Sequence, residues 1–468
     1  MKLTKIVATI GPSSREIDVL RKMIRAGMNV ARLNFSHGNY EDHADLIKNI
    51  RVAAAQESCH IGLLQDLQGP RLRIGSLPDT GYILTEGEQW LLTNKSVDHE
   101  KNLQLNKIKH IPIKFPSLHK IIKPSHRILI ADGKFELQVD KIKDDEILVT
   151  VIRGGTLNSN KGLNFPDTRL DIPVITPKDK VDLLFGCMQG VHYIALSFVK
   201  SASDVHQLRK LIAKAQPDEK KQPKIIVKIE RQEALENLHE LIQATDAVMV
   251  ARGDLGIEIP AAQVPIEQKK IISLSIDYGK TVITATQMLE TMVKERLATR
   301  AEVSDVANAI WDLTDATMLS GETAQGAWPV ESVATMAEVA QRCEEYAQTI
   351  DYNNRIHHSA PMSSVFVGAL AMAGDAPTRF ILLTDNDENV RQFSSFRSSH
   401  NITVVSSNPM MAGWVALMRG VTTVMVVSSR DLARYMQTGT LPLHRIPGVQ
   451  DIMIVGTTKD SYHLILHR

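Results

Sequence analysis

KIIVKIE, residues 224–230, and AVMVARGDLG, residues 247–256, decide the fold of this chain. Val, Ile and Ala fill most of both runs, which is typical of parallel strands buried on both faces. Charged side chains nevertheless stand at the end of the first run and just past the end of the second: Lys228, Glu230 and Asp254. Charges are rarely buried without a partner or a metal ion. These three residues are therefore candidates for a functional site.

The residue types at these strand ends indicate a particular chemistry. Glu230 and Asp254 provide the carboxylate oxygens that a hard divalent cation such as Mg²⁺ prefers. A lysine beside them, Lys228, indicates an anionic substrate. The alternative is a group of salt bridges at the strand ends with no catalytic role, because structural ion pairs also place charges at such positions. Taken alone, these residues leave both interpretations open.

The composition fits an enzyme with several domains. A chain of 468 residues is too long for one hydrophobic core, so roughly two or three domains are expected. The formal net charge is +1, which gives no electrostatic argument for nucleic acid or a membrane as a partner. The three cysteines lie far apart and lack metal-ligand spacing, which indicates a reducing compartment. Neither an apolar signal segment nor a run long enough to span a bilayer is found. We therefore expect a cytoplasmic protein.

Short apolar runs rich in β-branched residues recur along the chain, each followed by a polar or glycine-containing loop. There are eight of them, at residues 5–10, 29–34, 61–66, 192–197, 224–229, 247–251, 281–285 and 316–319. Amphipathic stretches such as 15–26, 203–215 and 302–311 lie between most of them. This α/β pattern predicts a (β/α)8 TIM barrel. A doubly wound sheet also alternates, and the count of eight favours the barrel. Polar residues cluster at the C-terminal ends of the runs, where barrel enzymes place their chemistry.

The alternation breaks twice. Between Arg71 and Phe165 the helical period disappears, and short alternating or apolar runs predict an inserted small β-barrel. Because it leaves from a loop after the third strand, this insertion is expected above the catalytic face, as a lid or as a passive module.

A second break, at residues 346–361, precedes a smaller α/β pattern that is a candidate for regulation. The predicted domains are a barrel at 1–70 and 166–345, a lid at 71–165 and an α/β domain at 350–468.

Several longer motifs follow one another along the chain. They are AGMNVARLNFSHG (26–38), IIVKIE (225–230), MVARGDLGIE (249–258), TATQMLE (284–290), TRAEVSDVAN (299–308) and MLSGETA (318–324). Together they resemble the pyruvate kinase family over about residues 1–345, and the remainder resembles it more loosely. The resemblance implies the same three-part fold and a homotetramer.

The resemblance implies a reaction at the last step of glycolysis. A phosphoryl group passes from phosphoenolpyruvate to ADP, which gives pyruvate and ATP. Such transfer needs positioning and charge neutralisation more than covalent help from the protein. By resemblance, Glu230 and Asp254 bind Mg²⁺ (or Mn²⁺), and Lys228 neutralises the transferring group. Arg32 holds the same phosphate, for which its planar fork is suited.

The resemblance also assigns residues around the reacting carbon. Thr286 matches the threonine near the substrate methylene, where it orients the proton donor or relays its proton; a threonine hydroxyl alone is a poor acid. Gly253 lacks a side chain, so its backbone N–H can approach the substrate carboxylate, with Asp254 and a helix N-terminus beside it. A plain turn is the alternative for Gly253. Ser320 and Glu322 are expected behind the site, where Glu322 would orient the Lys228 ammonium.

For ADP, the resemblance points to Arg73, His37 and Lys161. Lys161 belongs to the insertion, so it reaches the nucleotide phosphates only when the lid closes. The alternative for Lys161 is a solvated surface charge, and for His37 a packing or capping role.

The chain departs from many family members in its monovalent cation region. Those members hold K⁺ with residues that match Asn34, Ser36, Asp66 and the carbonyl of the next residue. They carry Thr at the position of Leu67 and Glu at the position of Arg71. A guanidinium at position 71 supplies a fixed positive charge, so we expect Arg71 to replace the cation and K⁺ not to be required.

The C-terminal domain departs as well. Members activated by fructose 1,6-bisphosphate carry a Ser/Thr-rich phosphate loop where this chain has LLTDNDENVR. Asp385, Asp387 and Glu388 would repel a phosphate there, so that effector is not expected. Two further functions stay open at this stage: an oxo-acid lyase, which also uses a carboxylate pair, and a metabolite sensor that has kept the fold.

Overall fold

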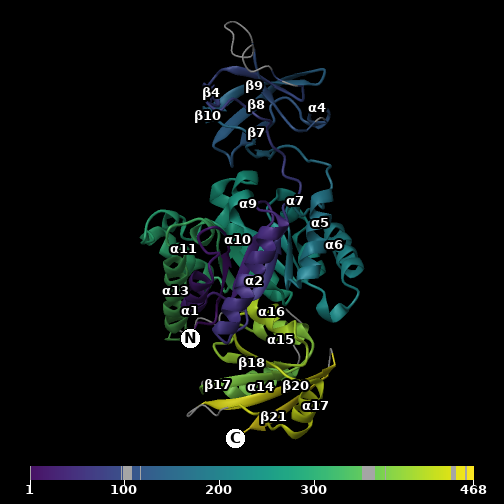
Figure 1. Ribbon diagram of the computed structural model, residues 1–468, viewed down its shortest axis with the longest axis vertical. Helices are drawn as coiled ribbons and strands as arrows, with labels where there is room; N and C mark the ends of the chain where they lie inside the picture. The colour runs from purple at the N-terminus through teal and green to yellow at the C-terminus, as the bar shows by residue number, and fades with distance from the viewer. Residues whose placement is uncertain are drawn as a thin grey trace.

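The computed structural model has three parts stacked along its long axis (Figure 1). A barrel surrounded by helices lies in the centre, a β domain lies above it, and an α/β domain with the C-terminus lies below. The structure describes residues 2–95, 97, 108–115, 117–349, 364–374, 376–443, 449–458 and 461–467. Most of the break predicted at 346–361 lies outside these residues.

Eight parallel strands close into the barrel, in the order β1-β16-β15-β14-β13-β12-β3-β2. The strands are β1 (Lys5–Thr9), β2 (Val30–Asn34), β3 (Gly62–Asp66), β12 (Tyr193–Leu196), β13 (Lys224–Ile229), β14 (Ala247–Ala251), β15 (Thr281–Ala285) and β16 (Ala316–Leu319). Each predicted run contains one of these strands, and the bounds differ by at most a residue or two. The predicted TIM barrel is confirmed.

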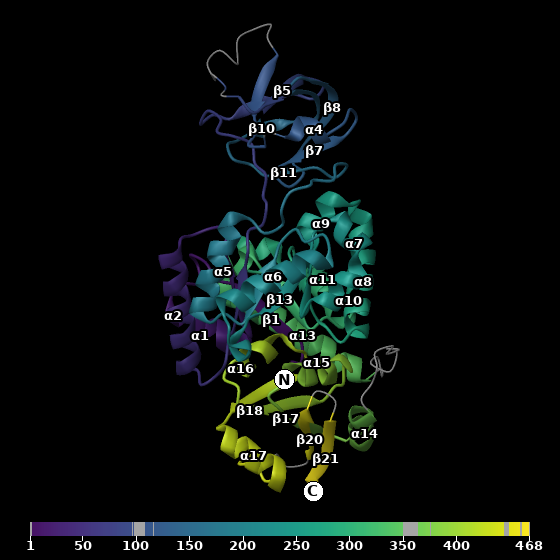
Figure 2. The ribbon, with the colours of Figure 1, turned by 90° about the vertical axis from the view of Figure 1, so that its right-hand side faces the viewer.

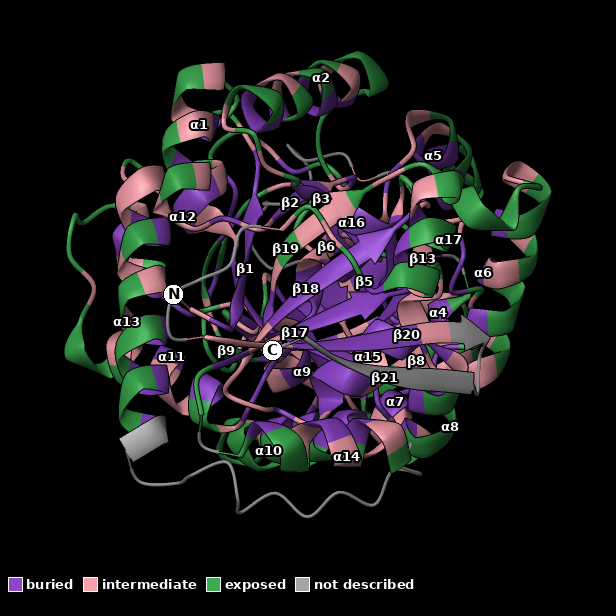
Figure 3. Cartoon of the chain, turned by 90° about the horizontal axis from the view of Figure 1, so that it is seen from below, coloured by how far each residue is buried: buried purple, intermediate pink, exposed green. Residues whose placement is uncertain are grey.

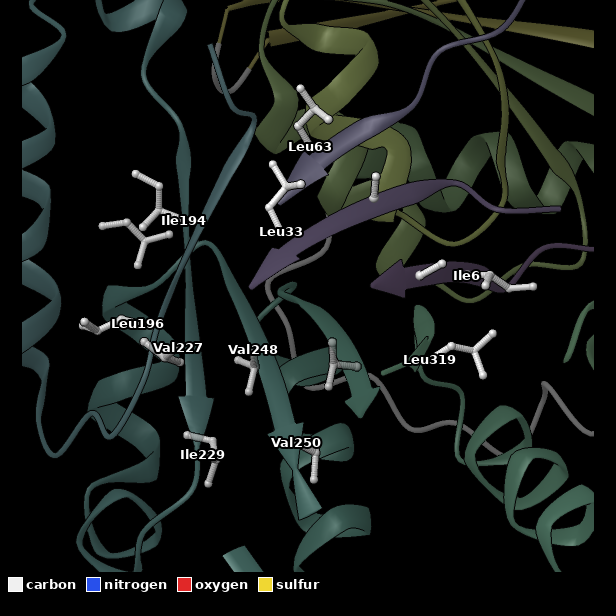
Figure 4. Packing of buried hydrophobic residues seen from close by; sticks show 14 of the residues in the cluster. Ile6, Leu33, Leu63, Ile194, Leu196, Val227, Ile229, Val248, Val250 and Leu319 are labelled. Carbon is white, nitrogen blue, oxygen red and sulfur yellow. The ribbon is translucent and has the colours of Figure 1, made fainter. Parts of the chain in front are cut away.

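Alternation along the strands decides which side chains face the inside of the barrel. Val227 and Ile229 belong to the apolar cluster between strands and helices (Figure 4), whereas Ile226 belongs to the cluster inside the barrel. Because successive side chains of a strand point to opposite faces, Lys228 shares the inner side with Ile226. Glu230, two residues further on, continues on that side. The strand thus delivers both charges to the upper opening of the barrel.

Helices surround the barrel (Figure 2). They are α1 (Ile17–Ala26), α2 (Tyr40–Gln56), α5 (Pro177–Gln189), α6 (Ala202–Ala215), α7 (Gln232–Glu236), α8 (Leu238–Ala244), α9 (Arg252–Glu258), α10 (Val264–Asp277), α11 (Arg300–Trp311), α12 (Gly321–Ala324) and α13 (Pro329–Thr349). Capping boxes stabilise the N-termini of several of these helices. Examples are Thr176 with Asp179 at the start of α5 and Thr299 with Glu302 at the start of α11. Within the described residues, no helix has the length and apolar character needed to cross a bilayer.

The insertion carries its own apolar core around the buried Trp90 and Tyr82. Its elements are β4 (Tyr82–Leu84), β5 (Gln89–Thr93), β6 (Lys109–Pro112), α4 (Leu118–Ile121), β7 (Arg127–Ile130), β8 (Phe135–Lys143), β9 (Glu146–Arg153), β10 (Gly155–Leu157) and β11 (Leu163–Asn164). Six strands form one mixed sheet, in the order β11-β7-β8-β9-β5-β6, and β10 pairs with β4 separately. The insertion is therefore the all-β domain predicted, built as a half-barrel of six strands beside the separate β4–β10 pair.

The C-terminal part is a five-stranded sheet flanked by helices. Its strands are β17 (Thr378–Leu383), β18 (Asn401–Ser406), β19 (Val421–Val426), β20 (Gln450–Thr458) and β21 (Ser461–His467), and its helices are α14 (Ser364–Ala373), α15 (Asp387–Ser395), α16 (Met411–Trp414) and α17 (Ser429–Thr438). All neighbouring strands are parallel except β20 and β21. Seen from below, this sheet lies across the lower end of the barrel (Figure 3).

Contacts between the two parts close the lower end of the barrel. Leu417, in the short 3-10 helix η5 (Val415–Leu417), is buried in the same cluster as the inward-facing Val7 and Leu64. Arg397 forms a buried two-pronged ion pair with Asp315, with both N–O distances 2.6 Å. Removing one partner of such a buried pair typically costs about 3–5 kcal/mol. The lower end is therefore filled, and the upper end remains for chemistry.

Candidate active site

A cavity of about 90 Å³ opens at the C-terminal ends of the barrel strands. Its wall contains many of the predicted site residues: Arg32, Asn34, Ser36, Asp66, Arg71, Lys228, Glu230, Asp254 and Thr286. Leu67, Gln68, Ser197, Phe198, Met249, Ala251 and Met318 complete it. Residues more than 250 positions apart in sequence thus meet around one space, because the closed barrel brings all its strand ends together.

Lys228 is the centre of the charge arrangement. Its Nζ lies 2.7 Å from Glu230 Oε1 and 3.3 Å from Asp66 Oδ1, and it donates a hydrogen bond to Ser197 Oγ at 2.9 Å. Only 9% of the residue is exposed. Burial disfavours the ammonium, but the charges of Asp66 and Glu230 outweigh it and raise the pKa of Lys228 above its ordinary value. The lysine therefore stays positive at neutral pH.

Arg32 approaches the same carboxylate from β2. Its Nε and Nη2 both lie 2.7 Å from Asp66 Oδ2, and its Nη1 donates to Thr9 Oγ1 at 2.9 Å. Burial alone would raise the pKa of Asp66, yet the charges of Lys228 and Arg32 lower it below its usual range. Asp66 is thus a permanent anion that fixes the position of two cations beside the cavity.

Glu230 and Asp254 supply the carboxylates. Glu230 Oε2 accepts a hydrogen bond from the backbone N–H of Phe198 at 2.7 Å, and Asp254 lies in the first turn of α9, with Arg71 Nη2 at 3.5 Å. Burial raises the pKa of Glu230, and repulsion from Asp254 adds to this shift, while Lys228 offsets it only in part. A bound cation would relieve that repulsion.

These two carboxylates fit a hard divalent ion. Within the described residues, no group of three or more Asp, Glu, His or Cys side chains is close enough to hold a metal ion. An ion held here would have two carboxylate ligands and would take its other ligands from substrate or water. Mg²⁺ is usually held in this way, by one or two carboxylates together with substrate oxygens and water.

Thr286 follows β15 in an unusual backbone conformation. Its φ is 68° and that of Gln287 is 54°, both in the left-handed region that non-glycine residues rarely adopt. The Thr286 hydroxyl oxygen accepts the backbone N–H of Gly253 at 2.8 Å. The N–H predicted to meet the substrate carboxylate is therefore engaged by Thr286 in this structure. A Cβ at position 253 would lie 3.4 Å from this hydroxyl oxygen, an ordinary van der Waals distance, so packing in this structure does not by itself require a glycine there.

The oxygens of the monovalent cation region already have protein donors. Asn34 Oδ1 accepts the N–H of Ser36 at 3.1 Å, and the Leu67 carbonyl accepts the Ser197 hydroxyl at 2.7 Å. Asp66 is held by the two cations described above. Arg71 lines the same cavity, where it forms an ion pair with Asp254, at 3.5 Å.

Three predicted nucleotide ligands lie outside the cavity wall. His37 is exposed at the rim, and its pKa is lowered by partial burial and by the charges of Arg71, Arg73 and Arg32. Arg73 donates to the Asn160 carbonyl at 2.8 Å, at the base of the insertion. Lys161 is exposed on the neighbouring segment of that base, where position 73 bridges to position 162.

The two residues expected behind the site connect loops. Glu322 is 1% exposed and accepts the backbone N–H groups of Ser320, at 2.7 Å, and Leu289, at 3.1 Å. It thereby joins the loop after β16 to the loop after β15. Among the described residues, no contact joins Glu322 to Lys228, so the expected orienting role stays a prediction; the contacts of Glu322 are with the two loops.

Sequence reasoning gave no role to several residues that shape the site. Ser197 receives the Lys228 ammonium and donates to Leu67, and its place at a strand end was the available signal. Phe198, with φ 57°, presents its N–H to Glu230. Nothing in the sequence marks a backbone amide of this kind.

A TIM barrel with buried cations and two carboxylates at the C-terminal strand ends has the features of an enzyme that acts on anionic substrates. The family model described as pyruvate kinase, barrel domain, matches residues 1–333. Pyruvate kinase 2 of Synechocystis is 42% identical over 440 residues, which cover 93% of this chain and 72% of that protein. The pyruvate kinase of Clostridium perfringens is 37% identical over 430 residues, covering 90% and 88%.

A solved structure agrees with these sequence relatives. The crystal structure of a pyruvate kinase from Cryptosporidium parvum has a TM-score of 0.87 and 33% identity, and the match covers 99% of this chain and 96% of that one. The chain belongs to the pyruvate kinase family.

Proposed function

We propose that this chain transfers the phosphoryl group of phosphoenolpyruvate to ADP, giving pyruvate and ATP, with Mg²⁺ (or Mn²⁺) and without a need for K⁺. The observation that carries the proposal is the arrangement of Lys228 and Arg32 beside Glu230 and Asp254 around one cavity. Two fixed cations suit a phosphate that must be neutralised before two anionic substrates can approach each other.

Lys228 and Arg32 act on the phosphoryl group. Asp66 holds both cations in place, so little reorganisation is needed when negative charge moves from the attacking ADP oxygen to the leaving enolate oxygen. Arg32 keeps its Nε and Nη2 on Asp66 and attracts the phosphate by its fixed charge, and the ammonium of Lys228 neutralises the transferring group. The metal, held by Glu230 and Asp254, would neutralise charge on phosphoryl and enolate oxygens.

Thr286 acts on the enolate that remains. The methylene carbon must take up a proton, and the threonine hydroxyl orients a donor water or relays its proton. Gly253 and the start of α9 offer N–H groups for the substrate carboxylate. Because Gly253 N–H is given to Thr286 in this structure, substrate binding and the orientation of the hydroxyl are coupled.

Arg71 replaces the monovalent cation. Support comes from the neighbouring oxygens of Asn34, Asp66 and Leu67, which accept from protein donors. The Arg71 guanidinium lines the same cavity, so an added cation in it would meet electrostatic repulsion.

Arg73, His37 and Lys161 bind the phosphates of ADP. All three lie at the rim or at the base of the insertion, and movement of the insertion over the barrel would carry Lys161 and Arg73 toward the cavity. Such closure also excludes water from the reaction. The domain divisions at 70, 166 and 345–350 are part of the same proposal, since the insertion must move as a unit.

We also propose a cytoplasmic homotetramer. The free thiols of Cys59, Cys187 and Cys343 agree with a reducing compartment, and the oligomer is expected from the family. Light scattering coupled to size-exclusion chromatography measures the assembly directly.

The test is pyruvate formation from phosphoenolpyruvate and ADP with Mg²⁺, in potassium-free buffer and with added K⁺. We expect activity in both buffers, with rates that agree within about twofold, because a fixed charge replaces the cation. Activity only with K⁺ would keep the kinase and reject the role of Arg71. Folded protein without activity in either buffer would reject the proposed reaction.

A further inference from the structure

Arg252 joins three consecutive carbonyls of the Thr286 loop. It is the first residue of α9, directly before Gly253 and Asp254. Its Nε donates to Ala285 O at 3.2 Å, and its Nη2 donates to Thr286 O at 2.6 Å and to Gln287 O at 3.4 Å. Only 10% of its side chain is exposed. A buried cation of this kind holds a backbone segment firmly, since charge-assisted hydrogen bonds are the strong ones.

The loop needs such a contact because its backbone is strained. Thr286 and Gln287 are consecutive non-glycine residues with φ of 68° and 54°. Each left-handed residue costs about 1–2 kcal/mol, and a β-branched residue such as Thr is especially disfavoured there. Without compensation the loop would relax toward ordinary backbone angles, and the Thr286 hydroxyl would leave the cavity wall.

Arg252 is itself fixed from the other side. Its Nη1 donates to Asp305 Oδ1 on α11 at 2.7 Å and to Gln268 Oε1 on α10 at 3.3 Å. Gln268 in turn donates to Asp312 at 3.0 Å. The guanidinium therefore bridges two barrel helices and the loop. Its rigid planar shape lets it reach acceptors on both sides at once. A lysine ammonium cannot reach both sets of acceptors.

A second contact sets the orientation of the hydroxyl. The residue after Arg252 donates its backbone N–H to Thr286 Oγ1, so this oxygen acts as an acceptor toward α9. The hydrogen of the hydroxyl is not used in that bond, and Thr286 lines the cavity. Arg252 and Gly253 thus hold the backbone and the side chain of the same threonine.

We propose that Arg252 is a positioning residue for the proton-transfer half of the reaction. It holds residues 285–287 in the conformation that presents the Thr286 hydroxyl to the reacting carbon. This inference rests on the proposed function. In the step it serves, a C–H bond forms at the enolate methylene as the O–H bond of the donor breaks, and the donor oxygen recovers a proton from solvent. Phosphoryl transfer, which depends on Lys228 and Arg32, is not its task.

The test compares Arg252→Lys with Arg209→Lys. Arg209 is a matched control, because it bridges Asp246 and the Ala244 carbonyl at the opposite end of β14, away from the cavity. Two rates are measured: exchange of the pyruvate methyl hydrogens in D₂O by NMR with Mg²⁺ and ATP, and ATP formation in a single turnover of phosphoenolpyruvate with ADP, which reports phosphoryl transfer alone. The solvent isotope effect on kcat and the melting temperature are measured on the same samples.

We expect Arg252→Lys to lower methyl exchange roughly tenfold or more, as misplacement of a catalytic group does. The KM for phosphoenolpyruvate should change much less, and the solvent isotope effect should rise because protonation becomes limiting. Asp305→Asn keeps the guanidinium and loosens its anchor, so a smaller loss with the same pattern is expected, even if Arg252→Lys folds poorly. Arg209→Lys should leave both rates unchanged.

Equal losses of methyl exchange and of phosphoryl transfer would indicate general damage and overturn the inference. Wild-type exchange in both Arg252→Lys and Asp305→Asn would overturn it as well. If the unaltered protein forms no pyruvate, the proposed function itself fails, and the two failures are thereby distinguished.

Discussion

Lys228 Nζ lies 2.7 Å from Glu230 Oε1. The two residues are separated by one position on β13 and its exit, so both face the upper opening of the barrel. One strand end therefore carries the cation for the phosphoryl group and a carboxylate for the metal. Their close contact also pairs two buried charges, and burying either charge without the other would destabilise the fold.

Loss of a metal carboxylate is expected to weaken metal binding. Glu230→Gln removes a charged ligand and should reduce the affinity for Mn²⁺ by roughly ten- to a hundredfold, the range seen even for groups that only orient metal ligands. Free Mn²⁺ is measured by electron paramagnetic resonance. Glu236→Gln, at an exposed carboxylate paired with Arg169, is the control. Equal Mn²⁺ affinity in both variants would remove Glu230 from the metal site.

Reversal of charge at position 71 is expected to create a need for K⁺. Arg71→Glu removes the fixed cation, so activity in potassium-free buffer should fall roughly tenfold or more, and added K⁺ should restore part of it. Leu67→Thr in the same chain adds a hydroxyl oxygen and should increase the restoration. The measurement is the initial rate of pyruvate formation by each variant over a range of K⁺ concentrations. Full activity of Arg71→Glu without K⁺ would show that Arg71 does not take the place of the cation.

The barrel and the cavity wall were predictable from sequence because they depend on strand periodicity. Eight apolar runs were sufficient for the barrel and placed Lys228 and Glu230 at its opening, whereas Arg32, Arg71 and Thr286 were assigned through the resemblance to the family. The pairing of strands within the insertion was not predictable, since β10 pairs with β4, which precedes it by more than 60 residues. Local patterns carry no information on such distant pairings.

Backbone conformation accounts for most of what was missed in the site. The N–H of Phe198 and the left-handed Thr286 and Gln287 have no signature in the residue types. Arg252 stands beside recognised motif residues, yet its role depends on the positions of α10 and α11. Leu417 reaches the inside of the barrel from another domain.

Acid is expected to weaken the contact between the barrel and the C-terminal domain at His192. Burial, and then the charges of Arg51 and His60, lower the pKa of His192 to about 4. Its Nδ1 accepts the N–H of Leu63, and its ring packs against Gly413. Between pH 6.5 and 4 the unfolded chain binds a proton at this residue and the folded chain does not. The free energy of unfolding therefore falls as pH falls through this window.

This loss is measured by urea unfolding at pH 7 and pH 5. His192→Asn keeps an acceptor but does not titrate, so its free energy of unfolding should fall by about 1–2 kcal/mol less than that of the unaltered chain. His206→Asn, at an exposed histidine of α6, should behave like the unaltered chain. The same pH dependence in all three proteins would contradict the assignment to His192.

The most direct test of the account is the turnover of Lys228→Met beside that of Lys280→Met. Lys280 is a second lysine of the barrel, at the opposite end, where it donates to the Thr245 carbonyl. We measure pyruvate formation from phosphoenolpyruvate and ADP, together with Mn²⁺ binding and melting temperature. The account predicts that Lys228→Met loses roughly a hundred- to a thousandfold in kcat while it folds and binds Mn²⁺, and that Lys280→Met remains active. Near-normal kcat in folded Lys228→Met would contradict the central claim.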